Sequence, residues 1–181
     1  MRAFILSLAV AAATATAALA QAADADTLVM QLKDGEVRID LNTEEAPQHA
    51  ERLKTLANRG FYDGLKFHPV IPGFMAQTGD PRGDGTGGSE LPDLQAEFSD
   101  TPFERGTVGM ARSADPNSAN SQFFIMFNEA PHLNGEYTVV GTVTDGMDAV
   151  DAVKKGSVAA NGTVDDPDTI VKMRTADQIG S

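Results

Sequence analysis

The sequence predicts a mainly β domain, a closed eight-stranded antiparallel β-barrel capped by two α-helices. Short runs in which apolar and polar residues alternate recur along the chain, and Gly, Pro, Asp and Asn separate them. Only two segments show helical periodicity, and no internal repeat is present. Many short strands with turn residues between them are typical of a barrel, in which no sheet edge is left exposed. The strand-like runs are residues 27–33, 36–41, 65–70, 74–77, 106–112, 121–127, 137–144 and 169–175.

The first two runs are joined by Asp34-Gly35, which is a typical hairpin turn. The first helix is expected to begin near Pro47, a favoured early helix position, with Thr43 as its cap. Its apolar residues share one face, and Gly60 ends it. Residues 145–155 are predicted to form a second, shorter helix. We interpret the first helix as scaffold.

The composition excludes several classes of function. The chain has 26 acidic and 14 basic residues, which give a net charge of -12. Because phosphate groups repel such a chain, neither nucleic acid nor anionic membrane is expected as a partner. Cysteine is absent, which excludes disulfides and thiol nucleophiles. The histidines, His49, His68 and His132, are far apart in the sequence, so no metal site is expected.

The N-terminus has the layout of a secretory signal peptide. Arg2 supplies a positive charge, an apolar stretch of small residues follows, and Ala18-Leu19-Ala20 offers a cleavage site before Gln21. A transmembrane anchor fits less well, because the apolar run is short. The sequence therefore predicts a signal peptide over residues 1–20 and a single domain over residues 21–181. The mature protein is expected to be periplasmic or secreted, free of the membrane after cleavage, and monomeric.

Two segments combine an apolar surface with a few amide side chains. The segments are residues 67–80 and 109–125. Because side chains alternate along a strand, Met75 and Gln77 share one face of the first segment, and Gln122 and Phe124 share one face of the second. Two glutamines without partners would be costly in a dry core. The pattern indicates either a cleft that recognises amide groups or a barrel core in which both glutamines are satisfied.

A Gly-rich stretch without periodicity, residues 79–95, lies between these segments. We interpret it as a long loop, which in a compact domain is usually functional or mobile. Its acidic residues Asp80, Asp84 and Glu90 do not have the spacing of an EF-hand. They are therefore expected to be solvated.

Both segments resemble the signature of the cyclophilins, a family of peptidyl-prolyl cis-trans isomerases. Further matches are Gly85-Thr86-Gly87-Gly88, Leu133-Asn134-Gly135 and residues 139–141, and the resemblance extends from about Thr27 to Thr175. It implies an eight-stranded antiparallel barrel with two helices, cis-trans isomerisation of X-Pro bonds, and no cofactor. It also implies proline-containing peptides and unfolded or folding proteins as partners. The reaction needs no nucleophile or general base, and none is evident in the sequence.

The resemblance also implies the residues of the site. The catalytic residues would be Phe74, Gln77, Gln122 and Phe124. The wider substrate-binding set would be Met75, Gly85, Thr86, Ala111, Arg112, His132, Leu133 and Tyr137. Within this set, His132 stands where many members of the family carry tryptophan, and Tyr137 stands where they carry histidine.

One position departs from the family pattern. The motif that usually reads Phe-His-Arg is here Phe67-His68-Pro69. The family arginine donates hydrogen bonds to the twisted amide, whereas proline has neither a side-chain donor nor a backbone N–H. Three interpretations stay open: a weakened isomerase, a non-catalytic proline-peptide-binding chaperone module, or replacement of the lost cation by Arg112 or Arg82. A small-ligand carrier barrel is the rival from another class, and the Gly-rich loop and the pocket motif argue against it.

Overall fold

The computed structural model describes residues 24–179, so the predicted signal peptide over residues 1–20 lies outside the described part. Eight strands form one sheet in the order β3-β4-β6-β5-β7-β2-β1-β8, and all neighbouring pairs are antiparallel. The predicted runs coincide with strands to within a few residues, except residues 65–70, of which only Val70 belongs to a strand. The strands are β1 (Thr27–Leu32), β2 (Gly35–Leu41), β3 (Val70–Ile71), β4 (Met75–Thr78), β5 (Thr107–Met110), β6 (Phe123–Met126), β7 (Val139–Asp145) and β8 (Lys172–Thr175).

The sheet is curled but open, so the predicted closed barrel is wrong. Its two edges, β3 and β8, do not pair with each other. The segments that precede them are joined by a bridge between Lys66 and Thr169 and by a few backbone hydrogen bonds, such as Phe67 N–H to Asp168 O at 2.9 Å. The outer edge of β3 is bonded to a loop instead of a strand. Val70 N–H donates to Gly162 O at 2.9 Å, and Val70 O accepts from Gly156 N at 2.9 Å. The outer edge of β3 is therefore bonded to this loop and not to β8.

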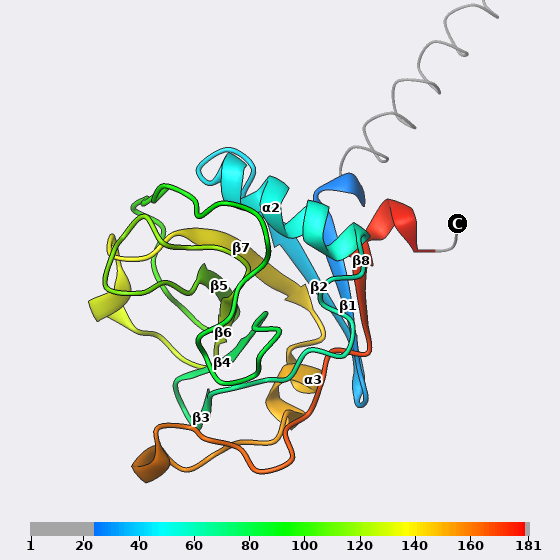
Figure 1. Cartoon of the computed structure of the whole chain (residues 1–181), viewed down its shortest axis with the longest axis vertical. Helices are drawn as coiled ribbons and strands as arrows, with labels where there is room; N and C mark the ends of the chain where they lie inside the picture. The colour runs from blue at the N-terminus through cyan, green and yellow to red at the C-terminus, as the bar shows by residue number, and fades with distance from the viewer. Residues whose placement is uncertain (1–23, 180–181) are drawn as a thin grey trace, which may run out of the picture.

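Two helices lie at opposite ends of the curled sheet (Figure 1). The longer helix, α2 (Pro47–Asn58), packs against β7 and β8. The shorter helix, α3 (Met147–Ala152), packs against β2 and covers less of the chain than the predicted 145–155. Three turns of 3-10 helix complete the described part: η1 (Pro131–Leu133), η2 (Val158–Ala160) and η3 (Ala176–Gln178). No helix within residues 24–179 is long and apolar enough to cross a membrane.

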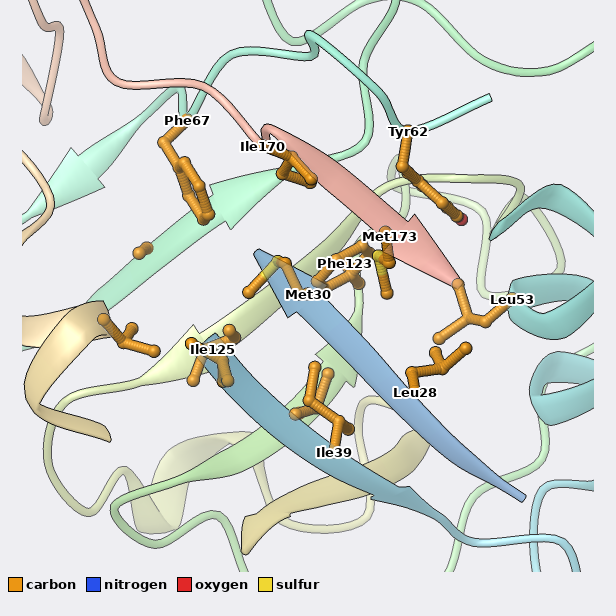
Figure 2. Close-up of a cluster of buried hydrophobic side chains, with 14 of the residues drawn as sticks. Leu28, Met30, Ile39, Leu53, Tyr62, Phe67, Phe123, Ile125, Ile170 and Met173 are labelled. Carbon is orange, nitrogen blue, oxygen red and sulfur yellow. The ribbon is translucent and has the colours of Figure 1, made fainter. Parts of the chain in front are cut away.

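The main core lies inside the curl, where alternate residues of the strands meet the inner face of α2 (Figure 2). Tyr62 is fully buried there, with its ring edge-on to Phe123 at 5.5 Å between centroids. Its hydroxyl donates to Ser121 O at 3.0 Å, so the one polar atom of this ring has a partner. The labelled side chains of Figure 2 are Leu28, Met30, Ile39, Leu53, Tyr62, Phe67, Phe123, Ile125, Ile170 and Met173.

The N-terminus of α2 is capped by a carboxylate from a distant loop, so the predicted cap at Thr43 is wrong. The residue at the cap position is Ala46, which makes no side-chain cap bond. The Glu97 carboxylate accepts from the backbone N–H of Gln48 at 3.1 Å and of His49 at 3.1 Å. A helix leaves its first N–H groups without backbone partners, and a negative charge at this end is favourable. The contact therefore attaches to α2 the segment that follows the loop of residues 79–95.

The same carboxylate binds the buried ring of His49. The two atoms that approach are His49 Nδ1 and Glu97 Oε2, 2.6 Å apart. Burial would raise the pKa of Glu97, but hydrogen bonds from His49 and from two backbone N–H groups lower it below its ordinary value. The carboxylate is therefore ionised, and Nδ1–H must be the donor. His49 Nε2 is buried without a partner in the described structure, and burial lowers the pKa of this histidine.

We expect the fold to lose stability as the pH falls below about 6.5, the unperturbed pKa of histidine. Because the pKa of His49 is lowered in the folded protein, the unfolded chain binds a proton at a higher pH than the folded chain does. Acidification therefore lowers the free energy of unfolding. Stability is fully present above the unfolded-state pKa and is lost as the pH approaches the lower folded-state pKa. Urea unfolding at pH 7.5, 6.5 and 5.5 measures the free energy of unfolding directly.

The matched control is His49→Asn, whose side-chain N–H can replace Nδ1–H but does not titrate. Its free energy of unfolding should change less than that of the natural protein over the same pH range. The loss through Glu97 begins only below its ordinary pKa of 4.5, outside this range. Equal pH dependence of both proteins between 7.5 and 5.5 would show that His49 is not responsible.

Candidate active site

Strand β6 has two apolar faces, and the second one is the floor of a cleft. Phe123 and Ile125 belong to the main core, whereas Phe124 and Met126 belong to a smaller cluster on the opposite face. This smaller cluster comprises Met75, Phe103, Phe124, Met126, Ala130, Leu133 and Val139. Over it lies a cleft of about 730 Å³. A cleft of this size with an apolar floor and a few polar groups is typical of a ligand site.

Most of the residues that the sequence singled out line this one cleft, although they come from separate segments of the chain. The predicted residues in the lining are Phe74, Met75, Gln77, Gly85, Thr86, Ala111, Arg112, Gln122, Phe124, Leu133 and Tyr137. His132 is exposed and outside the lining, where it stacks on Phe74 with 5.9 Å between ring centroids. Pro69 is also outside the lining, but it lies beside Gln77, whose N–H donates to Pro69 O at 2.9 Å.

Several polar lining residues were missed by the sequence reasoning. They are Ser89, Asp93, Ser113, Ser118 and Asn120. All of them lie outside the named strands, in segments without periodicity. Neither alternation nor helical spacing marks such positions, so only the folded loops bring them to the cleft.

The aromatic floor depends on a glycine beneath it. Phe124 stacks on Phe103 with 5.7 Å between ring centroids, and Tyr137 meets Phe124 edge-on at 5.8 Å. A Cβ atom on Gly109 would lie 2.4 Å from the Phe124 ring and 2.6 Å from the Phe103 ring. Any larger residue would displace both rings, so Gly109 allows the floor to form.

The two glutamines bond to each other, and only one keeps a free acceptor. Gln77 Nε2 donates to Gln122 Oε1 at 2.7 Å. Gln122 Nε2 donates to Gly85 O at 3.1 Å and to Gly87 O at 2.7 Å. The amide of Gln122 therefore positions the Gly-rich loop. Gln77 Oε1 has no partner among residues 24–179, so it is available to accept an N–H from a ligand.

The Gly-rich loop is ordered around a buried carboxylate. Asp80 is 2 % exposed, so the expectation that it is solvated is wrong. Its oxygens accept from the backbone N–H groups of Arg82 at 2.8 Å, Asp84 at 2.9 Å and Gly85 at 2.6 Å. A Cβ on Gly87 would lie 2.0 Å from Asp80 Oδ1, so the loop can wrap the carboxylate only with glycine there. Successive N–H groups converging on one anion make a stable loop.

The next part of the loop is held by Asn120 and by an arginine of α2. Asn120 Oδ1 accepts from Ser89 N at 2.8 Å, and Asn120 Nδ2 donates to Leu91 O at 2.9 Å. Arg52, which is 7 % exposed, donates to Pro92 O at 2.7 Å and to Asn120 O at 3.2 Å. These bonds join α2 to the rim of the cleft. Among residues 24–179, no group of three or more His, Asp and Glu side chains is placed to hold a metal ion.

Comparisons with known proteins agree with this geometry. The model of the family "Cyclophilin type peptidyl-prolyl cis-trans isomerase/CLD" matches residues 27–175. The chain belongs to the cyclophilin family. It is 58 % identical over 158 residues to a probable peptidyl-prolyl cis-trans isomerase of Brucella suis, with 81 % of each chain covered. It is 43 % identical over 130 residues to peptidyl-prolyl cis-trans isomerase B of Bacillus subtilis. That alignment covers 70 % of this cyclophilin and 90 % of the Bacillus protein.

Solved cyclophilin structures have the same fold. A cyclophilin of Cryptosporidium parvum, crystallised in the presence of the dipeptide Ala-Pro, matches with a TM-score of 0.75 and 27 % identity. The match covers 82 % of this chain and 98 % of that one. A cyclophilin from Hirschia baltica matches with a TM-score of 0.77 and 25 % identity, over 87 % and 76 % of the two chains. The chain is therefore an enzyme of the peptidyl-prolyl isomerase type.

We expect Asp80→Ala to destabilise this cyclophilin by about 2 kcal/mol or more, because three backbone N–H groups lose a buried acceptor. Urea unfolding measures the change. The control is Glu90→Ala in the same loop, which removes an exposed carboxylate and should change the free energy of unfolding by less than about 0.5 kcal/mol. Similar small effects of both substitutions would mean that Asp80 does not hold the loop.

Proposed function

We propose that this cyclophilin isomerises X-Pro bonds of peptides and folding proteins in the exported compartment, at a rate that is reduced by Pro69. The observation that carries the proposal is the cleft itself, in which an apolar floor lies beside the free acceptor of Gln77. The chemistry suits such a site. Rotation about an X-Pro bond has a barrier of about 20 kcal/mol, and uncatalysed exchange takes roughly tens of seconds.

The apolar end of the cleft is proposed to hold the proline ring. Phe74, Met75, Phe124 and Leu133 line this end. The Cryptosporidium relative that was crystallised with Ala-Pro supports a ligand of this kind. Gln77 Oε1 would accept a backbone N–H of the bound peptide. Such contacts bind the ground state, but only contacts that strengthen as the amide twists raise the rate.

The twisted amide loses its resonance, and the prolyl nitrogen regains a lone pair. A donor placed at this nitrogen lowers the barrier, and loss of one such donor typically costs about 3 kcal/mol. Pro69 lies beside Gln77 and supplies no donor. This is the physical reason for a reduced rate.

We expect Pro69→Arg to raise kcat/KM at least tenfold on a short X-Pro peptide, because a guanidinium beside Gln77 can donate to the twisted amide. Exchange NMR on the mature protein measures the isomerisation rate. The matched control is Pro69→Met, which replaces proline with a long but uncharged side chain. An equal gain in both variants would assign the effect to removal of proline instead of the new donor.

The alternative is a chaperone module that binds proline-containing peptides without turnover, and the same missing donor favours it. The two functions share a ligand and differ only in rate. If the natural protein binds an X-Pro peptide without accelerating its exchange, while Pro69→Arg accelerates it, the binding module is the correct account. If the natural protein accelerates exchange at catalytic concentrations, the isomerase is correct.

Export is proposed from the N-terminal layout of Arg2, the apolar stretch and Ala18-Leu19-Ala20. We expect the mature chain to begin at Gln21, and mass spectrometry of the protein recovered from the exported fraction measures its N-terminus. Substituting Ala20→Leu should leave the precursor uncleaved, because the cleavage site requires small residues. A chain that keeps Met1 in the cytoplasm would contradict export.

A further inference from the structure

We propose that Arg112 is the catalytic cation of this cleft and takes over the work of the arginine that Pro69 replaces. The inference rests on the proposed isomerase function and identifies the group that makes turnover possible without a donor at position 69. It is carried by the place of Arg112 in the cleft, by the contacts that hold its guanidinium, and by the charge and donors that those contacts leave available.

Arg112 is the single Lys or Arg among the described residues that line the cleft. The other arginine near this site, Arg82, is exposed and outside the lining. Its side chain reaches Thr86 Oγ1 at 3.4 Å instead. The structure therefore distinguishes between the two cations that the sequence left open.

The backbone places Arg112 across the cleft from Gln77. Strand β5 ends at Met110, but Ala111 N–H still donates to Gln122 O at 2.9 Å, so the chain continues to follow β6. Arg112 is the next residue. Gln77 lies on β4, which pairs with the other side of β6. A peptide lying over Phe124 would therefore have the acceptor of Gln77 on one side and the cation on the other.

The guanidinium is held rigidly before any ligand arrives. It lies over the Tyr137 ring, with Cζ 4.4 Å from the ring centroid. Nε and Nη2 donate to Glu136 O at 3.3 and 2.8 Å, and Nη1 donates to Ser113 O at 3.0 Å. Tyr137 is itself fixed edge-on against Phe124. A preorganised donor loses little conformational freedom when the transition state forms, which makes it effective in catalysis.

These contacts leave N–H donors and the positive charge of Arg112 available to a ligand. Three of the five guanidinium N–H groups are used, so one on each terminal nitrogen remains. The acceptors are neutral carbonyls, and no carboxylate within residues 24–179 pairs with Arg112. By contrast, Arg105 and Arg174 are each bonded to an aspartate. Arg112 is only partly buried, and no described carboxylate neutralises its charge beside the apolar floor.

The remaining N–H groups of Arg112 would donate to the prolyl amide as it twists. The nitrogen lone pair is delocalised in the planar amide and localised in the twisted one, so a positive donor stabilises the twisted state more than the ground state. The contribution should therefore be seen in kcat more than in peptide affinity. No bond is made or broken and no proton is transferred in this step.

We expect Arg112→Ala to lower kcat roughly tenfold to a hundredfold, with a much smaller change in the dissociation constant of an Ala-Pro peptide. Exchange NMR at saturating peptide measures kcat, and isothermal titration measures binding. Arg112→Lys should recover only part of the rate, because an ammonium cannot lie flat on Tyr137 while it donates to two carbonyls. Arg112→Gln keeps a side-chain donor without the charge and should be as slow as Arg112→Ala.

A second test combines Arg112→Ala with Pro69→Arg, so that the result does not rest on a single variant. If both guanidinium groups serve the same amide, Arg112→Ala should cost less in the Pro69→Arg background than in the natural protein. Arg38→Ala is the matched control, since Arg38 lies on β2 outside the cleft lining, is partly exposed and ion-pairs with Glu36. It should leave kcat unchanged. Urea unfolding of each variant confirms that it is folded.

Four results would overturn the inference, and they separate it from the proposed function. An unchanged kcat in Arg112→Ala, with the natural protein active, overturns the role of Arg112 and leaves the isomerase in place. An inactive natural protein with an active Pro69→Arg variant shows that Arg112 does not replace the lost cation. Inactivity of both proteins overturns the isomerase function as well. A fall in kcat in Arg82→Ala equal to that expected for Arg112→Ala would assign the cation to Arg82.

Discussion

The alternation of side chains along β6 is the constraint on which the rest of the structure depends. Phe123 and Ile125 face the main core, and Phe124 and Met126 belong to the smaller cluster beneath the cleft, so a single central strand belongs to both apolar clusters. A shift of its register by one residue would exchange the two faces. Stability and function are thus coupled at this strand. The buried side chains of Phe123 and Ile125 fix the position of β6, and this in turn fixes Phe124 in the floor of the cleft.

The walls of the cleft are loops. Hydrogen bonds to side chains hold these loops in place, whereas backbone bonds between strands hold the floor. Asp80, Gln122, Asn120 and Arg52 each bind backbone atoms of the long loop. Glu97, which follows this loop, then bonds to α2 and to buried His49. The long loop has a Gly-rich sequence without periodicity, but a few buried or half-buried polar groups hold it in a defined conformation.

The loss of one arginine changes how the electrostatics of the cleft must be understood. The chain has a net charge of -12, and Arg105 and Arg174 each pair with an aspartate. Arg112 is different, since it is held by carbonyl oxygens and an aromatic ring. This kind of support orients a guanidinium without neutralising it. The cleft thus retains a cation although Pro69 provides none, and the two positions lie on opposite sides of β6.

The resemblance to the cyclophilins implied that Gln77 and Gln122 belong to one site. Period-two alternation and the hairpin turn around Asp34 determined from the sequence alone that the protein is mainly β. They did so because strand faces and turn chemistry are local properties of a chain. The open edge of the sheet was decided only by tertiary structure, where Gly156 and Gly162 bind the outer edge of β3. So were the cap from Glu97 and the burial of Asp80, because each joins groups that periodicity does not relate. The same holds for the contacts of Arg112, whose usefulness to the cleft depends on which carbonyls and which ring surround it in the folded protein.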